Sequence, residues 1–521
     1  MRAEFLAYES RFLFGHQDVR PRQRRGKTNT ASSEAEPASR VSAARGGASL
    51  VLGKTKRIHF VGIGGIGMSG IAELLTNLGY KVSGSDAKRS ELTDRLASLG
   101  VQIAIGHRAE NVGEVDVIVF SSAIRPDNPE LMVARTRRIT IIPRAELLGE
   151  LMRLRFGIAI AGAHGKTTTT SMIALMLERA GLDPTAVIGG RLSAFGGNSR
   201  LGRGAYVVAE ADESDRSFLM LFPAIAVMTN LDREHMEAYG SFENLRDAFV
   251  EFANKVPFYG AIVACADDAE LTALRPRLTR RLLTYGVTNQ DADIVATAIR
   301  LEGYGSECTV TRRRVADGKV ETLGRLTLQV PGSHSVQNAL AAVAVGLELE
   351  VPFGRITSAL AGFQGVERRM ERRGVVGGVT VIDDYGHHPT EIAAVLSAVR
   401  AAKPARVIVA FQPHRYSRTR DLMDEFGVAL ASADEVVLTD IYAASEDPIP
   451  GVTIETLADA VNAKRSTPVH VVKTLDEVAP TLAAMAQHGD VLMTLGAGSI
   501  GGVASRIVHE LERRRRREGV H

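Results

Sequence analysis

Three times along this chain, a short run of apolar and β-branched residues leads through a glycine-containing loop into a helix. The runs begin at Arg57, Phe156 and Val379, and similar runs alternate with amphipathic stretches after each of them. Strands that alternate with helices form parallel βαβ units. The alternation therefore predicts an α/β fold, and its three starts predict three domains. The length of 521 residues agrees, since a domain takes roughly 100–200 residues.

The domain boundaries are predicted where these alternations begin. The first residues show no sustained apolar period, which is typical of a disordered tail. The predicted parts are a disordered basic tail (1–53), an N-terminal Rossmann-like domain (54–155), a central P-loop mononucleotide-binding α/β domain (156–372) and a C-terminal Rossmann-like α/β domain (373–521). Within them, residues 281–330 are expected to be antiparallel, and Ser417–Leu430 is expected to be one helix.

The formal net charge of +3 comes from the two ends of the chain. Residues 1–50 hold nine Arg or Lys and five acidic residues, and Arg513–Arg517 is a run of five arginines. The remainder is mildly acidic. A basic surface of the kind that attracts nucleic acid or a membrane is therefore not expected.

Cysteine content and hydropathy indicate the compartment. Cys265 and Cys308 are the only cysteines, too few for a disulfide framework, which favours a reducing environment. No apolar run approaches the ~18 residues of a membrane span. We therefore expect a cytoplasmic protein without a membrane partner.

The first glycine loop, Gly62–Gly67, fits the pattern G-x-G-x-x-G between a strand and a helix. Such glycines let the backbone approach a pyrophosphate at a helix N-terminus. Asp86 follows the next strand, where an acidic side chain suits a ribose hydroxyl. The pattern predicts nucleotide-diphosphate binding over a bare tight turn. NAD is the default interpretation, although any diphosphate ligand satisfies the same chemistry.

The second loop is a stronger signal for phosphate binding. It is a shorter variant of the G-x-x-x-x-G-K-T pattern, whose first glycine would fall at Ile160, and it reads Gly162-Ala163-His164-Gly165-Lys166-Thr167-Thr168. Backbone N–H groups of such a loop surround a phosphate, the lysine neutralises β/γ oxygens, and the hydroxyl after it holds Mg²⁺. The preceding strand and the following helix make a chance Gly-Lys-Thr triplet a poor alternative.

Two further strands of this region end in polar residues. In Glu210–Asp215, Glu210 is nearest the strand end and is the expected Mg²⁺ ligand, whereas the other three acids fit a solvated turn equally well. The segment Thr229–Met236 ends a third strand and places His235 where it would line the same site.

The third block carries two polar loops, Asp383–Thr390 and Gln412–Thr419. Both follow predicted parallel strands, so they should converge on one sheet edge. Their histidines and arginines suit carboxylate and phosphate recognition. Zinc is not expected, because the adjacent His387 and His388 seldom bind one metal and no cysteine or third histidine has ligand spacing.

Together and in this order, these motifs resemble the Mur ligase family over about residues 56–510. The string Gly64–Gly70 resembles the alanine-adding members in particular. The residues that carry the resemblance are Ile58–Gly70, Gly162–Thr170, Glu210–Asp215, Thr229–Met236, Gly332–Asn338, Gly365–Arg369, Asp383–Glu391 and Gln412–Thr419.

The resemblance implies a cytoplasmic, ATP- and Mg²⁺-dependent ligase of peptidoglycan precursor synthesis. It would join L-alanine to the lactyl carboxylate of UDP-N-acetylmuramate through an acyl phosphate, so the first domain would bind a UDP-sugar and not NAD. Three alternatives stay open: a recycling ligase that adds a murein tripeptide to the same UDP-sugar, an NAD-dependent oxidoreductase with an added nucleotide domain, and a P-loop ATPase that serves as a binding module.

The resemblance also assigns roles to residues. UDP-sugar contacts are expected from Gly64, Gly65, Ile66, Gly67, Ser85, Asp86, His107, Ser121 and Ser122. ATP contacts are expected from Gly162, Ala163, His164, Gly165, Lys166, Thr167, Thr168, His334 and Asn338, with Mg²⁺ on Thr167, Glu210 and His235. Alanine would meet Tyr385, His388, Arg415 and Arg418. The expected catalytic residues are Lys166, Glu210, His235, Arg415 and Arg418. The carbamylated lysine of several family members is replaced by Phe249.

Overall fold

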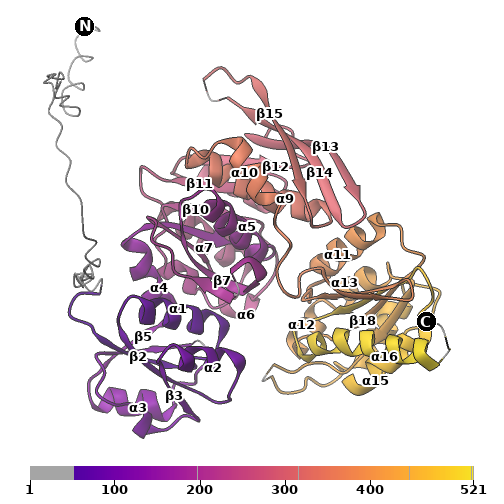
Figure 1. The fold of residues 1–521 in the computed structure, drawn as a ribbon, viewed down its shortest axis with the longest axis horizontal. Coiled ribbons are helices and arrows are strands. Elements are labelled where there is room, and N and C mark those ends of the chain that lie inside the picture. The colour runs from indigo at the N-terminus through magenta and orange to yellow at the C-terminus, as the bar shows by residue number, and fades with distance from the viewer. Residues whose placement is uncertain are drawn as a thin grey trace, which may run out of the picture. The chain divides into compact units, whose positions relative to one another are not determined.

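The computed structural model describes residues 52–517 and 519, except 122, 196, 315 and 445. Nearly all of the predicted tail, 1–53, and the Ser122 position therefore lie outside the described residues. Three separate sheets follow one another along the chain, each covered by helices (Figure 1). They confirm the predicted α/β class with three domains.

The first sheet has five parallel strands in the order β3-β2-β1-β4-β5. The strands are β1 (Arg57–Val61), β2 (Lys81–Asp86), β3 (Gln102–Ile105), β4 (Val117–Phe120) and β5 (Thr140–Pro143), and the helices are α1 (Ile66–Asn77), α2 (Glu91–Ser98), α3 (Pro129–Thr136) and α4 (Arg144–Arg153). The chain order reverses between β1 and β4, so the glycine loop after β1 opens at a topological switch point, where ligands of such sheets bind.

The central sheet has ten strands in the order β15-β14-β13-β12-β11-β10-β6-β9-β7-β8. Its strands are β6 (Phe156–Ala161), β7 (Thr185–Leu192), β8 (Gly197–Arg200), β9 (Tyr206–Glu210), β10 (Ile225–Met228), β11 (Ala261–Cys265), β12 (Leu282–Gly286), β13 (Ile294–Glu302), β14 (Gly305–Arg313) and β15 (Val320–Leu328). Its helices are α5 (Lys166–Arg179), α6 (Met236–Tyr239), α7 (Phe242–Asn254), α8 (Ala269–Leu274), α9 (Ser333–Glu348) and α10 (Phe353–Leu360).

Strands β6, β9 and β10 are neighbours and run parallel. The residues of β6 and β10 are buried on both faces apart from the first residue of β6, which explains their unbroken apolar sequences. The loops that follow these three strands meet at one edge, as the sequence predicts. The antiparallel expectation for 281–330 holds for β13 to β15, but β12 pairs in parallel with β11 and with the start of β13.

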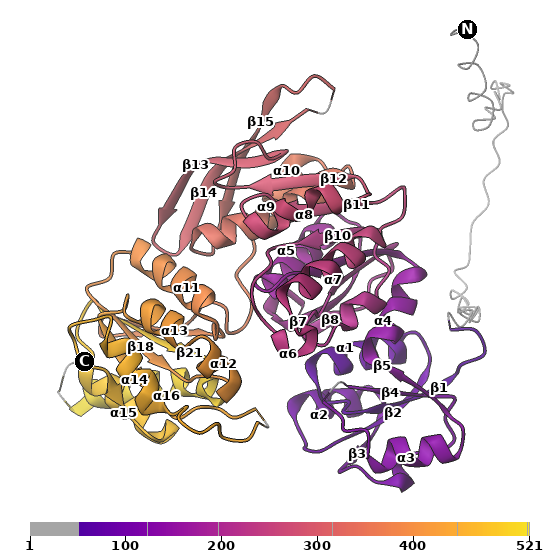
Figure 2. The same ribbon diagram turned by 180° about the vertical axis from the view of Figure 1, so that it is seen from behind.

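The third sheet has the order β16-β17-β21-β18-β19-β20. Its strands are β16 (Glu371–Val376), β17 (Val379–Asp384), β18 (Val407–Phe411), β19 (Glu435–Leu438), β20 (His470–Val471) and β21 (Val491–Leu495). Its helices are α11 (Pro389–Ala401), α12 (Tyr416–Asp421), α13 (Met423–Leu430), α14 (Ile454–Asn462), α15 (Leu475–Met485) and α16 (Val503–Arg517). All strands except the edge strand β16 run parallel, and Figure 2 shows helices α11 and α16 beside them.

The prediction of one helix over Ser417–Leu430 is wrong. The helix breaks at Leu422, where φ is −123° and ψ is 26°, and α12 and α13 result. The break turns Leu422 and Met423 onto the apolar core beneath the sheet, so burial of these side chains prevails over helix continuity.

Among the described residues, no helix combines the length and apolar character that crossing a membrane requires.

Candidate functional site

The phosphate loop of the central domain is tied to the end of the neighbouring strand β10. The N–H of His164 donates to Asn230 Oδ1 at 2.8 Å, and the hydroxyl of Thr229 donates to the carbonyl of His164 at 2.6 Å. Gly162 has a φ of 140°, and a Cβ there would lie 2.0 Å from Thr229 Oγ1. Glycine is therefore required where the loop passes β10, and α5 begins directly after the loop.

Lys166, the first residue of α5, points back over this loop. Its Nζ donates to the carbonyl of Gly162 at 2.6 Å and to Glu213 Oε1 at 2.7 Å. Burial raises the pKa of Glu213 to about 7 although the Lys166 charge opposes the shift. The ammonium is thus held by a buried carboxylate where a phosphate would bring its own negative charge.

Thr167 and Glu210, the residues expected to bind the first Mg²⁺, lie in the phosphate loop and beside it. Glu210, at the end of β9, accepts the N–H of Gly189 at 2.6 Å. Burial raises the pKa of the Glu210 carboxyl, while Gly189, Lys166 and the Thr167 hydroxyl oppose that shift. A carboxylate and a hydroxyl are oxygen ligands of the kind that Mg²⁺ takes. The two residues therefore fit a magnesium ion.

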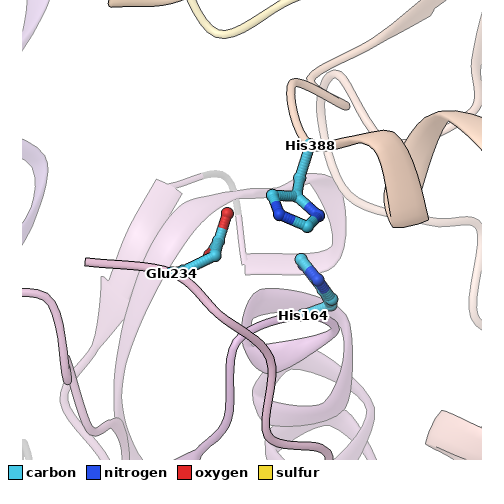
Figure 3. Close-up of side chains that lie close together, drawn as sticks. All are labelled: His164, Glu234 and His388. Atoms are coloured by element: carbon cyan, nitrogen blue, oxygen red, sulfur yellow. The ribbon is translucent and has the colours of Figure 1, made fainter. Parts of the chain in front are cut away.

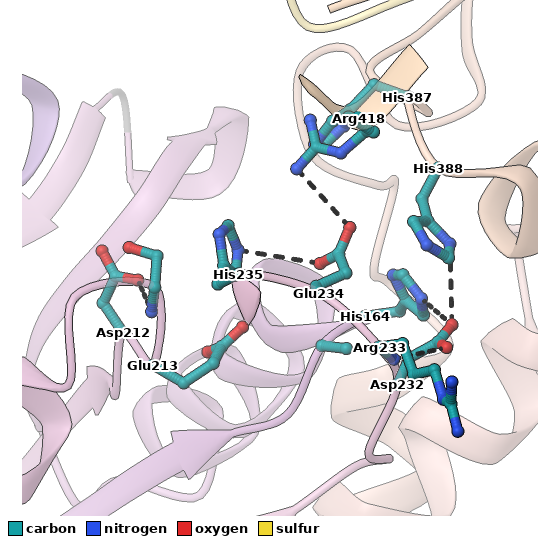
Figure 4. Close-up of polar contacts among 12 residues, drawn as sticks. His164, Asp212, Glu213, Asp232, Arg233, Glu234, His235, His387, His388 and Arg418 are labelled. Atoms are coloured by element: carbon teal, nitrogen blue, oxygen red, sulfur yellow. Dashed lines mark hydrogen bonds and ion pairs between the residues drawn. The ribbon is translucent and has the colours of Figure 1, made fainter. Parts of the chain in front are cut away.

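His235 ends the loop after β10 and starts α6 with a left-handed backbone, φ 57°. Its Nε2 lies 3.8 Å from Glu234 Oε2, and Glu234 Oε1 lies 3.7 Å from a guanidinium nitrogen of Arg418 (Figure 4). Arg415 contacts Glu237 at 3.4 Å. Both predicted arginines thus come from the C-terminal domain to acidic residues flanking His235.

A cavity of about 470 Å³ extends from the phosphate loop. Central-domain residues on its wall include His164, Gly165, Thr167, Thr168, His334 and Asn338, and C-terminal-domain residues include Asp384, Thr390 and Glu391. Burial, with the charge of Arg369 beside it, lowers the pKa of His334 to about 4. A neutral, half-buried ring suits the base of a nucleotide, and several residues predicted to contact ATP line this cavity.

The loops after β17 and β18 converge, which confirms the expectation of a common edge. The rings of His387 and His414 lie 5.7 Å apart, centre to centre. The ring of Tyr385 lies 5.0 Å from the guanidinium of Arg368 and 5.1 Å from that of Arg369. His388 caps the start of α11 and is almost fully buried.

In the first domain, the predicted sugar residues surround a buried carboxylate that the sequence did not single out. Glu130 of α3 is 0% exposed and accepts hydrogen bonds from Ser85 Oγ at 2.8 Å and from the Asn111 amide at 2.9 Å. His107 Nδ1 lies 2.9 Å from Ser85 Oγ. Burial alone would raise the pKa of Glu130, but its hydrogen bonds, led by that from His59, lower it.

The remaining predicted sugar residues lie on the glycine loop or near it. Asp86 accepts the N–H of Gly64 at 2.8 Å, so its carboxylate fixes the loop. Ile66 is 46% exposed at the start of α1. Ser121 follows β4, and its hydroxyl accepts from the N–H of Ala123 at 3.4 Å.

Two residues inside the quoted motifs lie on the cavity wall although no role was predicted for them. Arg369 lines the cavity and contacts Glu391 at 3.4 Å. Asp232 accepts from Thr390 of the C-terminal domain at 2.9 Å. Their presence in motif segments was the only available signal. Phe249, where the resemblance implies a lysine in several members of the family, is a buried core residue packed on Phe218.

Comparison with known proteins agrees with this architecture. Three family models match in order: the Mur ligase family catalytic domain at residues 57–156, the Mur ligase middle domain at 160–346, and the Mur ligase glutamate ligase domain at 368–498.

Named relatives extend over nearly the whole chain. The UDP-N-acetylmuramate–L-alanine ligase of Geobacter sulfurreducens is 53% identical over 465 residues, 89% of this chain and 99% of the relative. That of Sorangium cellulosum is 52% identical over 463 residues, 88% and 97% of the two chains.

Solved structures show the same fold. The UDP-N-acetylmuramate–alanine ligase MurC of Thermotoga maritima has a TM-score of 0.74 at 30% identity and covers 88% of this chain and 99% of its own. A murein peptide ligase of Psychrobacter arcticus has a TM-score of 0.65 at 25% identity, with 88% and 98% covered.

A Gly-Lys-Thr loop with a carboxylate and a hydroxyl beside it, in the middle one of three α/β domains, is typical of a nucleotide-binding enzyme. The chain belongs to the Mur ligase family.

Proposed function

We propose that this chain joins L-alanine to the lactyl carboxylate of UDP-N-acetylmuramate, with ATP converted to ADP and phosphate. The observation that carries the proposal is about 52% identity, over nearly the full length, to relatives named for this reaction. The sequence Gly64–Gly70 and the Lys166, Glu210 and His235 set agree with it.

Each domain has a proposed task. Residues 54–155 bind the UDP-sugar around Ser85 and His107, residues 156–372 bind ATP in the cavity beside the phosphate loop, and residues 373–521 bind alanine. The contact of Arg418 with Glu234 supports this division, because it brings the C-terminal domain to the acidic end of the phosphate site.

The chemistry follows from the charges at this site. A carboxylate is a poor electrophile, so it is first phosphorylated to an acyl phosphate, which the alanine amine then attacks. Lys166 exchanges Glu213 for phosphate oxygens and neutralises them. Arg415 and Arg418 orient the reactants, so that catalysis comes mainly from positioning and electrostatics.

Magnesium has a proposed place at Thr167 and Glu210, with His235 for a second ion. When bound, Mg²⁺ neutralises phosphate charge. The hard oxygen ligands at the loop support the first ion. We place the reaction in the cytoplasm, in agreement with two buried thiols, Cys265 and Cys308, that are not joined.

The test is phosphate release from ATP by the purified chain. Release should require both UDP-N-acetylmuramate and L-alanine, and omission of either should reduce it to background. Release that is independent of the UDP-sugar would contradict the proposal.

The second candidate is the recycling ligase, favoured by the likeness to the murein peptide ligase structure. The same assay with the murein tripeptide in place of alanine separates the two. Turnover with the tripeptide and none with alanine would select this alternative.

A further inference from the structure

Three side chains at the phosphate loop form a cluster to which the proposed reaction gives no joint role. They are His164 of the phosphate loop, Glu234 of the loop after β10, and His388 at the start of α11 (Figure 3). Each offers one ligand atom, and these atoms lie within 4.8 Å of one another. His164 and Glu234 belong to the central domain. His388 belongs to the C-terminal domain and lies more than 220 positions beyond His164 in the sequence.

Each of the three residues also carries a buried polar atom that lacks a hydrogen bond within the described part of the chain: His164 Nδ1, Glu234 Oε1 and His388 Nε2. Only long ionic contacts reach two of them, from Glu391 at 3.5 Å and from Arg418 at 3.7 Å. A buried polar atom without a partner costs roughly 1–3 kcal/mol. Three such atoms in one place indicate a missing ligand.

The surroundings of both imidazoles favour metal coordination. His164 Nε2 lies 2.9 Å from Asp232 Oδ2, so a proton held there leaves the Nδ1 lone pair free. His388 Nδ1 lies 3.5 Å from the same oxygen and 3.4 Å from the N–H of Thr390. A ring that donates from Nδ1 to Asp232 gives up the cap on Thr390 and leaves the Nε2 lone pair free as well. A carboxylate behind a histidine is the usual support of a metal-binding imidazole.

We propose that His164, Glu234 and His388 bind one divalent transition-metal ion of the zinc type, with a fourth position open to water or an oxygen of a substrate. Two imidazole nitrogens and a carboxylate oxygen form a ligand set that zinc accepts and magnesium does not prefer. Ligands on zinc stand about 3.4 Å apart when each bond is about 2.1 Å. Ligand atoms that lie within 4.8 Å of one another therefore approach by at most about 1.4 Å when the ion binds.

This site is distinct from the proposed Mg²⁺ residues and goes beyond the ligase reaction. The sequence excluded zinc because no third histidine had ligand spacing near His387 and His388, but the fold supplies His164 from another domain. The bound ion would hold the phosphate loop against the C-terminal domain.

The experiment uses Co²⁺ as a visible probe on the full chain, after removal of metals with a chelator and with excess Mg²⁺ present. We expect one equivalent of Co²⁺ with the absorption band of a nitrogen-ligated, low-coordinate ion, and displacement by one equivalent of Zn²⁺. His388→Ala and Glu234→Gln should each weaken Co²⁺ binding at least about 10-fold. No band in the wild type would overturn the proposal.

Two control variants keep the result specific. His387→Ala removes the neighbouring histidine, whose Nδ1 contacts its own loop at Tyr385 O, and should leave the band unchanged. His235→Ala tests the adjacent cluster of Glu213, Glu234 and His235. If His235→Ala abolishes the band and His388→Ala does not, the ion belongs to that cluster and the proposal is wrong. Zn²⁺ should also raise the melting temperature of the wild type but not of folded His388→Ala.

Discussion

At the scale of single residues, the partner of Lys166 decides how the phosphate site is kept ready. Its ammonium lies between a loop carbonyl and the buried Glu213 carboxylate. An unpaired buried charge would be costly, so this ion pair lets the site exist without nucleotide. In the proposed reaction, phosphate oxygens replace Glu213 as the partner.

Lys166→Ala should abolish turnover and leave the fold intact. Removal of one preorganised positive or donor group from such a site lowers kcat by about 10²-fold or more. The measurement is phosphate release together with circular dichroism. Lys464→Ala, which removes an exposed lysine of the C-terminal domain, is the control. Full activity of the Lys166 variant would remove the phosphate role.

His334 predicts a pH dependence of stability. Its pKa in the folded protein is lowered to about 4, first by burial and then by Arg369. An unfolded histidine titrates near about 6.5. The neutral ring therefore contributes stability that is present above about pH 6.5 and is lost as the pH falls toward about 4.

Urea unfolding of the wild type and of His334→Gln tests this. The free energy of unfolding of the wild type should decline relative to the variant between about pH 6.5 and 4. His509→Gln, an exposed position on α16, serves as control. A wild-type-minus-variant difference that is constant over this range would refute the expectation.

At the scale of elements, the phosphate loop is shaped by β10 as much as by its own glycines. Thr229 and Asn230 hold the loop carbonyl and N–H groups of His164. The loop sequence alone predicts a phosphate site, but its dependence on a strand about 65 residues later follows only from the parallel pairing of β6 and β10.

Gly162→Ala should disrupt ATP binding and destabilise the protein by about 1–3 kcal/mol or more. The backbone has a positive φ at this position, and the new methyl group would collide with the side chain of Thr229. Gly181→Ala is the matched control, since its φ is also positive at 83° but no atom lies within 4 Å of its Cβ position. The control should be strained without any change in the Kd for ATP. Equal ATP affinity in both variants would show that the contact with β10 is unimportant.

Elements with strong apolar periods were predictable, and weak or competing patterns were not. β6 matches its expected range, Phe156–Ala161, because a strand buried on both faces is apolar throughout. β8 reads Gly-Asn-Ser-Arg and has no strand signature, since its pairing with β7 determines it. The division into α12 and α13 is likewise decided by packing at Leu422.

At the scale of the whole molecule, the contacts of the C-terminal domain with the central domain complete the site. Arg418 is mostly buried and faces Glu234, whereas Arg420 is exposed and pairs with its neighbour Asp421. Only the first of these two arginines on one short helix therefore links domains.

Arg418→Ala should lower kcat by about 10²-fold with little change in the KM for ATP, because its charge acts on reactants from the opposite domain. Arg420→Ala should have near wild-type kinetics. Steady-state phosphate release over a range of ATP concentrations measures both. A large rise of KM for ATP at unchanged kcat would instead place Arg418 in nucleotide binding.

The sequence by itself determined the α/β class, the three domains, the glycine loop after β6 and the family. These follow from local patterns: apolar periodicity, glycines at strand ends and residue types beside them. Tertiary structure alone decided that Glu130 is buried against Ser85 and Asn111, that Glu213 holds Lys166, and that His164 meets His388. Such contacts depend on which loops the sheet order and domain packing bring together, and spacing along the chain carries no signal of them.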